Sequence, residues 1–136
     1  MAVSGVSATD AEIAHGTIVT EGEVIEQTII APEKTEAVVR EYFADIPVMI
    51  AVAKCESTFR HTLSDGSVLR GLVDNRDTGV MQINTYYHGD TADRMGLDLE
   101  DLHDNLTYAR DLYERQGTQP WNASRPCWGR TIAYNG

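Results

Sequence analysis

The fold is decided by the stretch Asp45-Ile-Pro-Val-Met-Ile-Ala-Val-Ala-Lys-Cys-Glu-Ser-Thr-Phe59. This stretch predicts a helix that Asp45 caps and whose first turn accommodates Pro47. Apolar side chains cover most of its circumference, so we expect the helix to be buried. Glu56 comes at the C-terminal end, where loss of water raises the pKa of a carboxyl group. A carboxyl group that stays neutral in this way can act as a general acid.

A second helical pattern precedes this helix. Thr35 opens it and it runs to about Phe43, with an inward stripe of Ala37, Val38, Val39, Tyr42 and Phe43. Residues 1–31 show no helical period, and we interpret them as a leader or linker, with a β-hairpin packed on the domain as the alternative. Pro32 marks the boundary, so residues 32–136 form the predicted domain.

Beyond Phe59 the pattern changes to short segments between turns. Residues 64–67 predict a turn, residues 68–73 are β-like, and residues 74–77 predict a second turn. We expect a small β-hairpin lobe that is too small to stand alone and that forms one wall of a cleft beside Glu56.

The C-terminal half is mainly helical. Asp90 is expected to cap a short helix that ends near Gly96, and Asp98 to cap another turn. Asp104 or Asn105 begins the most regular helix, which ends at Gln116 with Gly117 as its C-cap. Residues 118–129 have no periodicity and predict an ordered aromatic loop. The predicted class is therefore α+β, mainly helical with a small β-hairpin lobe.

Four motifs in this order resemble those of bacterial lytic transglycosylases and goose-type lysozymes. They are Glu56-Ser57-x-Phe59, Gly79-Val80-Met81-Gln82-Ile83-Asn84, Tyr87-His88 and Asn105-Leu106-x-Tyr108-Ala109-Arg110-x-Leu112-Tyr113. The resemblance covers roughly residues 36–134. It implies a lysozyme-like catalytic domain that cleaves the β-1,4 bond between N-acetylmuramic acid and N-acetylglucosamine in peptidoglycan.

The resemblance implies that Glu56 protonates the leaving oxygen and then acts as base while a 1,6-anhydro end forms. The first alternative is a hydrolytic, goose-type-like lysozyme in which Asp77 assists a water molecule. A turn residue is the simpler interpretation of Asp77. The second alternative is a lysozyme-fold module that binds glycan without cutting it, because fold does not fix function.

The resemblance also places several side chains near the sugar. The expected substrate-binding residues are Ser57, Met81, Gln82, Asn84, Tyr87, His88 and Tyr134. Gln82 and Asn84 are two apart in a β-like run and therefore share a face; a polar pair on the solvent side is the alternative. Trp121 and Trp128 are either sugar platforms or core residues. We expect no cofactor, and the acidic residues near His88 lack a metal-ligand spacing.

The chain has two cysteines, Cys55 and Cys127. Two buried thiols are one possibility. The other is a disulfide, which the resemblance favours because similar wall enzymes work outside the cytoplasm, where such bonds persist. No secretory signal is visible at the N-terminus, so an extracytoplasmic location implies that the signal has been removed or is not part of this sequence.

The charge and length of the chain limit the classes of partner that we expect. The 136 residues fit one domain, which we expect to be a monomer, and no apolar run is long enough for a membrane span. The formal net charge of −10 argues against nucleic acid, because phosphate binding needs clustered Lys and Arg. The same charge is expected to slow approach to anionic cell walls. Peptidoglycan glycan strands remain the expected partner.

Overall fold

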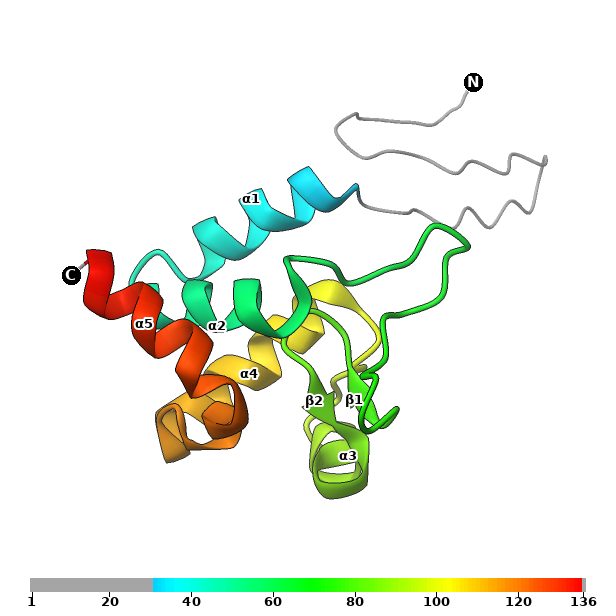
Figure 1. The fold of residues 1–136 in the computed structure, drawn as a ribbon. Coiled ribbons are helices and arrows are strands. Elements are labelled where there is room, and N and C mark those ends of the chain that lie inside the picture. Colours follow the sequence, from blue (N-terminus) through cyan, green and yellow to red (C-terminus); the bar gives the residue numbers. More distant parts are fainter. Residues whose placement is uncertain (1–30, 136) are drawn as a thin grey trace.

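The computed structural model describes the backbone of residues 31–135 and the side chains of residues 31 and 33–130. Its helices are α1 (Pro32–Tyr42), α2 (Pro47–Ser57), α3 (Thr85–Arg94), α4 (Leu102–Gln116), the 3-10 helix η1 (Gln119–Ser124) and α5 (Arg125–Asn135), and its strands are β1 (Asp77–Thr78) and β2 (Ile83–Asn84). This part of the chain is mainly helical with a small antiparallel hairpin, which confirms the predicted class in broad form (Figure 1). The predicted leader, apart from Ala31, lies outside the described residues.

Helix α2 lies at the centre and contacts α1, η1 and α5. Met49, Val52 and Ala53 are fully buried in it, as its apolar sequence predicts. The predicted cap is wrong. Ile46 is the N-cap residue and makes no side-chain hydrogen bond. Asp45 instead pairs with Arg110 of α4 at 2.9 Å, because a charged partner from a distant helix competes with the local cap.

Helix α1 begins earlier than predicted, at Pro32 rather than Thr35. Proline is favoured at the first helical position, where its missing N–H would have no partner. The inward stripe is correct at Val39 and Phe43, which are fully buried, whereas Ala37 is exposed.

Two helix starts also differ from the prediction. Helix α3 begins after Asn84, whose side chain accepts the Tyr86 N–H at 2.9 Å, so Asp90 lies inside the helix. Helix α4 begins after Asp101, whose carboxylate accepts the Asp104 N–H at 3.0 Å. Its predicted end at Gln116, followed by Gly117, is confirmed.

The β lobe is present, but its strands lie elsewhere. β1 pairs antiparallel with β2, with Asp77 opposite Asn84 and Thr78 opposite Ile83. Residues 68–73 contribute only isolated bridges, at Val68 and Arg70. The predicted strand is absent because the Leu72 and Val73 side chains are fully exposed, so no buried side chain holds this end of the segment in a sheet. The turn at residues 64–67 is confirmed.

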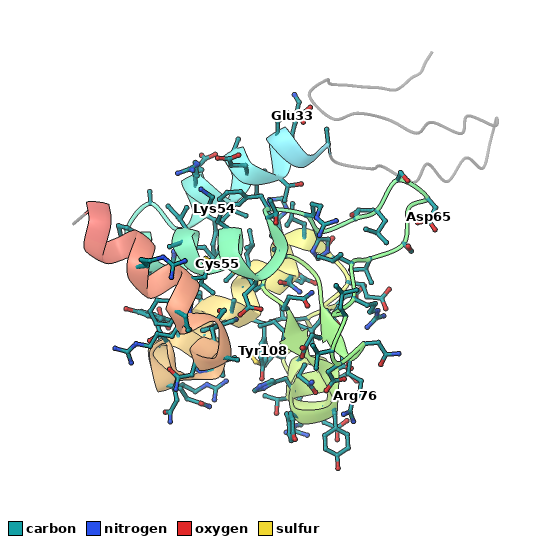
Figure 2. All side chains as sticks on the ribbon, in the orientation of Figure 1. Glu33, Lys54, Cys55, Asp65, Arg76 and Tyr108 are labelled. Atoms are coloured by element: carbon teal, nitrogen blue, oxygen red, sulfur yellow. A yellow bond between two sulfur atoms is a disulfide. The ribbon has the colours of Figure 1, made fainter. Side chains whose placement is uncertain are left out.

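The predicted aromatic loop at residues 118–129 is wrong, because this segment forms η1 and the first turns of α5. It gains its order from tertiary contacts. Trp121 and Trp128 are buried, and Trp128 Nε1 donates to the Trp121 carbonyl at 3.0 Å. A disulfide joins Cys55 to Cys127, with their Cα atoms 6.0 Å apart, which confirms the predicted bond and fastens α5 to α2. Cys55 lies where α2 and α5 come together (Figure 2).

No helix within residues 31–135 combines the length and the apolar character that crossing a membrane requires.

Candidate active site

Glu56 is half-buried in the last turn of α2. Its Oε2 atom accepts a hydrogen bond from the Ser124 hydroxyl at 2.6 Å. Burial raises the pKa of Glu56 above its ordinary value; the hydrogen bond from Ser124 opposes this, and the negative charge of Asp77 adds to the rise. The site therefore stabilises the neutral carboxyl group, the form that can donate a proton, more than solvent does at an exposed glutamate.

The chain turns sharply after Glu56. Thr58 and Phe59 both adopt left-handed backbone conformations, with φ of 55° and 58°. Such angles are costly for side chains with a Cβ atom and persist only where the surroundings compensate. Here Phe59 is only 5% exposed, so burial of its ring compensates for the strained turn. This turn ends α2 at the acid and leads the chain toward the β lobe.

The turn between β1 and β2 is held by a buried histidine. Burial lowers the pKa of His61, so its ring is neutral. Its Nδ1 atom accepts the Val80 N–H at 3.0 Å, which makes Nε2 the donor to the Glu100 carbonyl at 2.7 Å. Gly79 fits against this ring with φ of +76°, and a Cβ atom there would lie 2.5 Å from the His61 Cε1 atom. The position therefore requires glycine.

Two further side chains hold the same turn at Met81. The Met81 N–H donates to Asn105 Oδ1 at 3.0 Å, and the Met81 carbonyl accepts from Trp121 Nε1 at 2.8 Å. The Asn105 amide also donates to the Thr78 and Leu99 carbonyls at 3.0 and 2.8 Å. Asn105 belongs to α4 and Trp121 to η1, so the turn is tied to both.

A cavity of about 340 Å³ lies beside this turn. Figure 1 shows β1, β2 and α3 on one side of α4, with η1 and α5 on the other. The cavity is lined from both sides, by Asp77, Gln82, Ile83, Asn84, Tyr87, His88, Leu112, Gln116, Pro120 and Trp121. It therefore brings together five residues that the sequence predicts for the site, namely Asp77, Gln82, Asn84, Tyr87 and His88.

Glu56 does not line this cavity but lies next to it. Asp77, on the cavity wall, is near enough for its charge to raise the pKa of Glu56. Ser124, which bonds to Glu56, follows three residues after Trp121 of the same wall. Glu56 is thus linked to the cavity wall through the charge of Asp77 and through the segment that carries Ser124.

Gln82 and Asn84 reach the cavity for a different reason than predicted. Gln82 has φ of 52° and lies in the turn, and its amide donates to the Gly79 carbonyl at 3.0 Å, so the argument from strand alternation fails. The Asn84 side-chain NH₂ group donates to Asp77 Oδ1 at 2.9 Å and to Asp74 Oδ2 at 3.0 Å, while the side-chain oxygen Oδ1 caps α3. Asn84 thus fixes the Asp77 carboxylate as well as contributing to the wall.

Two other predicted residues, Met81 and Ser57, are not on the cavity wall. The Met81 side chain is fully buried and packs in the core. Ser57 is 2% exposed and donates to the Ala53 carbonyl at 3.0 Å. Both side chains are buried among protein atoms, and the sugar contacts expected of them stay predictions. Tyr134 lies in α5, and its side chain is outside the described part of the chain.

Tyr87 and His88 lie on α3 at the mouth of the cavity. Tyr87 is 71% exposed and packs edge-to-face with Tyr86, their ring centroids 5.0 Å apart. Arg76 lies 4.9 Å from the Tyr86 ring centroid, close to α3 (Figure 2). His88 Nδ1 is 2.9 Å from the Tyr108 hydroxyl, and burial lowers the pKa of His88. Tyr87 therefore presents an exposed aromatic ring beside the polar wall.

Sequence reasoning missed Ser124 and His61, for which no local pattern gives a signal. Asn105 was recognised only as part of a helix start, and its role as the anchor of the turn becomes visible in the fold. Trp121, for which two roles were open, is 3% exposed and contributes to the cavity wall; Trp128 is a core residue. Within residues 33–130, no group of three or more His, Cys, Asp or Glu side chains is arranged to hold a metal ion.

Comparison of the chain with models of protein families, with curated proteins and with solved structures found no match.

Proposed function

We propose that this chain is a lysozyme-like peptidoglycan lytic transglycosylase that cleaves the β-1,4 bond between N-acetylmuramic acid and N-acetylglucosamine. The observation that carries the proposal is the half-buried Glu56 carboxyl group, whose raised pKa favours the neutral form beside a polar cavity. The order of the Glu-Ser, Gly-x-Met-Gln and Asn-containing motifs supports the same reaction class. Peptidoglycan strands are the proposed partner.

In this mechanism one carboxyl group serves twice. Neutral Glu56 donates its proton to the glycosidic oxygen, and the bond to the N-acetylmuramic acid C1 atom breaks. The Glu56 carboxylate then removes the proton from the 6-hydroxyl group of the same sugar, whose oxygen attacks C1 and closes the 1,6-anhydro ring. Burial favours the acid form, and the hydrogen bond from Ser124 stabilises the carboxylate form. Both states are therefore accommodated.

Hydrolysis is the second candidate, and the position of Asp77 favours it. Asp77 lines the cavity, and the Asn84 amide holds its Oδ1 atom at 2.9 Å. An inverting hydrolase uses a second carboxylate to activate water on the far side of the sugar. Asp77 would take that role while Glu56 remains the acid.

The disulfide supports an extracytoplasmic location for this activity, because such bonds persist in oxidising compartments. The net charge of −10 works against rapid encounter with an anionic wall, most strongly at low ionic strength.

The test is digestion of purified peptidoglycan, with the products weighed by mass spectrometry. Anhydro ends and reducing ends differ by one water. We expect anhydro products from the wild type and a rate at least about 100-fold lower for Glu56→Gln, the range for loss of a general acid. Glu114→Gln, an exposed change on α4, is the matched control and should retain activity.

Other outcomes decide among the alternatives. If the wild type forms reducing ends and Asp77→Asn no longer forms them, the reaction is hydrolysis and not transglycosylation. Undiminished cleavage by Glu56→Gln would refute Glu56 as the acid. Glycan binding without cleavage by the wild type and by Glu56→Gln would support a binding module instead of an enzyme.

A further inference from the structure

The Ser124 hydroxyl lies between two acceptors. Its Oγ atom is 2.6 Å from Glu56 Oε2 and 3.1 Å from the Trp121 carbonyl oxygen. A hydroxyl group has one hydrogen to donate. The Trp121 carbonyl already accepts the Trp128 Nε1–H at 3.0 Å. The shorter distance and this existing bond leave the Ser124 hydrogen to Glu56.

We propose that Ser124 is a positioning residue for Glu56: its hydroxyl engages Oε2 and leaves Oε1 as the oxygen that exchanges a proton with the substrate. This inference rests on the proposed function. Among the described residues, no donor forms a hydrogen bond to Oε1. The proton of a neutral carboxyl group resides on the oxygen that does not accept the hydrogen bond, so Oε1 carries it.

Ser124 is held in place from both sides along the chain. Three residues before it, Trp121 is buried and donates to the Met81 carbonyl at 2.8 Å. Three residues after it, Cys127 forms the disulfide with Cys55, the residue next to Glu56. Two tertiary anchors therefore fix the hydroxyl relative to the carboxyl group, and a short, well-placed hydrogen bond limits the orientations that Glu56 can adopt.

The charges around Glu56 make the bond to Ser124 consequential. Asp77 of β1 acts on Glu56 and raises its pKa, in the same direction as burial. Two basic residues lie near Glu56 in sequence or through Ser124: Lys54 of α2 is exposed, and the Arg125 guanidinium at the start of α5 lies over the Trp128 ring, 6.0 Å from its centroid. Neither is among the groups that shift the pKa of Glu56, whereas the hydrogen bond from Ser124 stabilises its ionised form. Without it, the carboxylate that must act as base is less stable.

The experiment compares Ser124→Ala with Ser124→Thr, which retains a hydroxyl. The Glu56 titration is followed by carbon NMR of the labelled full-length chain, and cleavage is followed against pH. We expect the Glu56 midpoint to move to higher pH in Ser124→Ala and to stay near the wild-type value in Ser124→Thr. In Ser124→Ala, kcat should fall roughly tenfold with KM little changed, as for loss of one hydrogen bond to a charged group.

The two readouts separate the two proposals. An unchanged Glu56 midpoint in Ser124→Ala would overturn the role of Ser124, even if cleavage depends on Glu56. A shifted midpoint in a chain that does not cleave peptidoglycan would overturn the proposed function while supporting the bond between Ser124 and Glu56. Ser124→Ala is expected to fold, because the Trp121 carbonyl keeps its hydrogen bond from Trp128. A Glu56 midpoint that shifts as far in Ser124→Thr as in Ser124→Ala would also overturn the proposal.

Discussion

Removing the disulfide should lower the stability of this chain by an amount that its loop length sets. Cys55 and Cys127 are 72 residues apart in sequence. On the loop-entropy model, closing a loop of this size stabilises the fold by about 4 kcal/mol, because the open unfolded chain has more conformations. Changing both residues to serine tests this. Cys127 is exposed and Cys55 half-buried, so the added hydroxyl groups keep access to solvent.

The assay is urea unfolding of the wild type and the double variant, each with and without reductant. We expect the variant to lose about 4 kcal/mol of unfolding free energy and its thermal midpoint to fall by roughly 20 °C. Reduced wild type should match the variant, which should not respond to reductant. A loss below about 1 kcal/mol would refute the loop-entropy reasoning. It would mean that packing of the buried Trp121 and Trp128 alone holds η1 and α5 on α2.

Two further predictions concern Glu56 and the glycines. Because the folded-state pKa of Glu56 is raised, ionisation of this group destabilises the fold. Glu56→Gln should therefore match the unfolding free energy of the wild type below pH 4 and exceed it at pH 8. The difference in unfolding free energy should grow as pH rises from the unfolded-state pKa and level off above the folded-state pKa. Equal unfolding free energies at both pH values would contradict the raised pKa. Gly79→Ala places a Cβ atom 2.5 Å from His61 at positive φ and should cost more than about 2 kcal/mol, whereas Gly66→Ala, with positive φ but nothing within 4 Å, should cost about 1 kcal/mol. Thermal unfolding of both variants checks this, and equal losses would contradict the close contact with His61.

Local sequence patterns predicted the helices best where they also had a clear apolar stripe or stop signal. The apolar run of α2 and the Gly117 stop of α4 are both present in the fold. The Asp45 cap failed because Arg110, on a helix far along the chain, takes that carboxylate. Helix α5 was missed because its sequence has no helical period, and its order depends on the disulfide and the tryptophans.

In the candidate site, too, some features follow from local sequence and others depend on tertiary packing. The position of Glu56 at the end of a buried helix follows from the sequence, and so does the presence of polar residues shortly after Gly79. Which of those residues line the cavity depends on the turn: Gln82 does so with a left-handed backbone, whereas Met81 and Ser57 are buried. No periodic pattern encodes those orientations.

By itself, therefore, the sequence determined a mainly helical chain, an acid at the end of an apolar helix and the pair of cysteines. The tertiary structure decided what surrounds that acid: Ser124, 68 residues away, supplies its hydrogen bond, and Asp77 of β1 supplies a charge that acts on it. The physical reason is range. Helical periods, caps and turns depend on neighbours a few residues apart, whereas the desolvation and hydrogen bonding that set a pKa depend on whichever distant segments pack against the group.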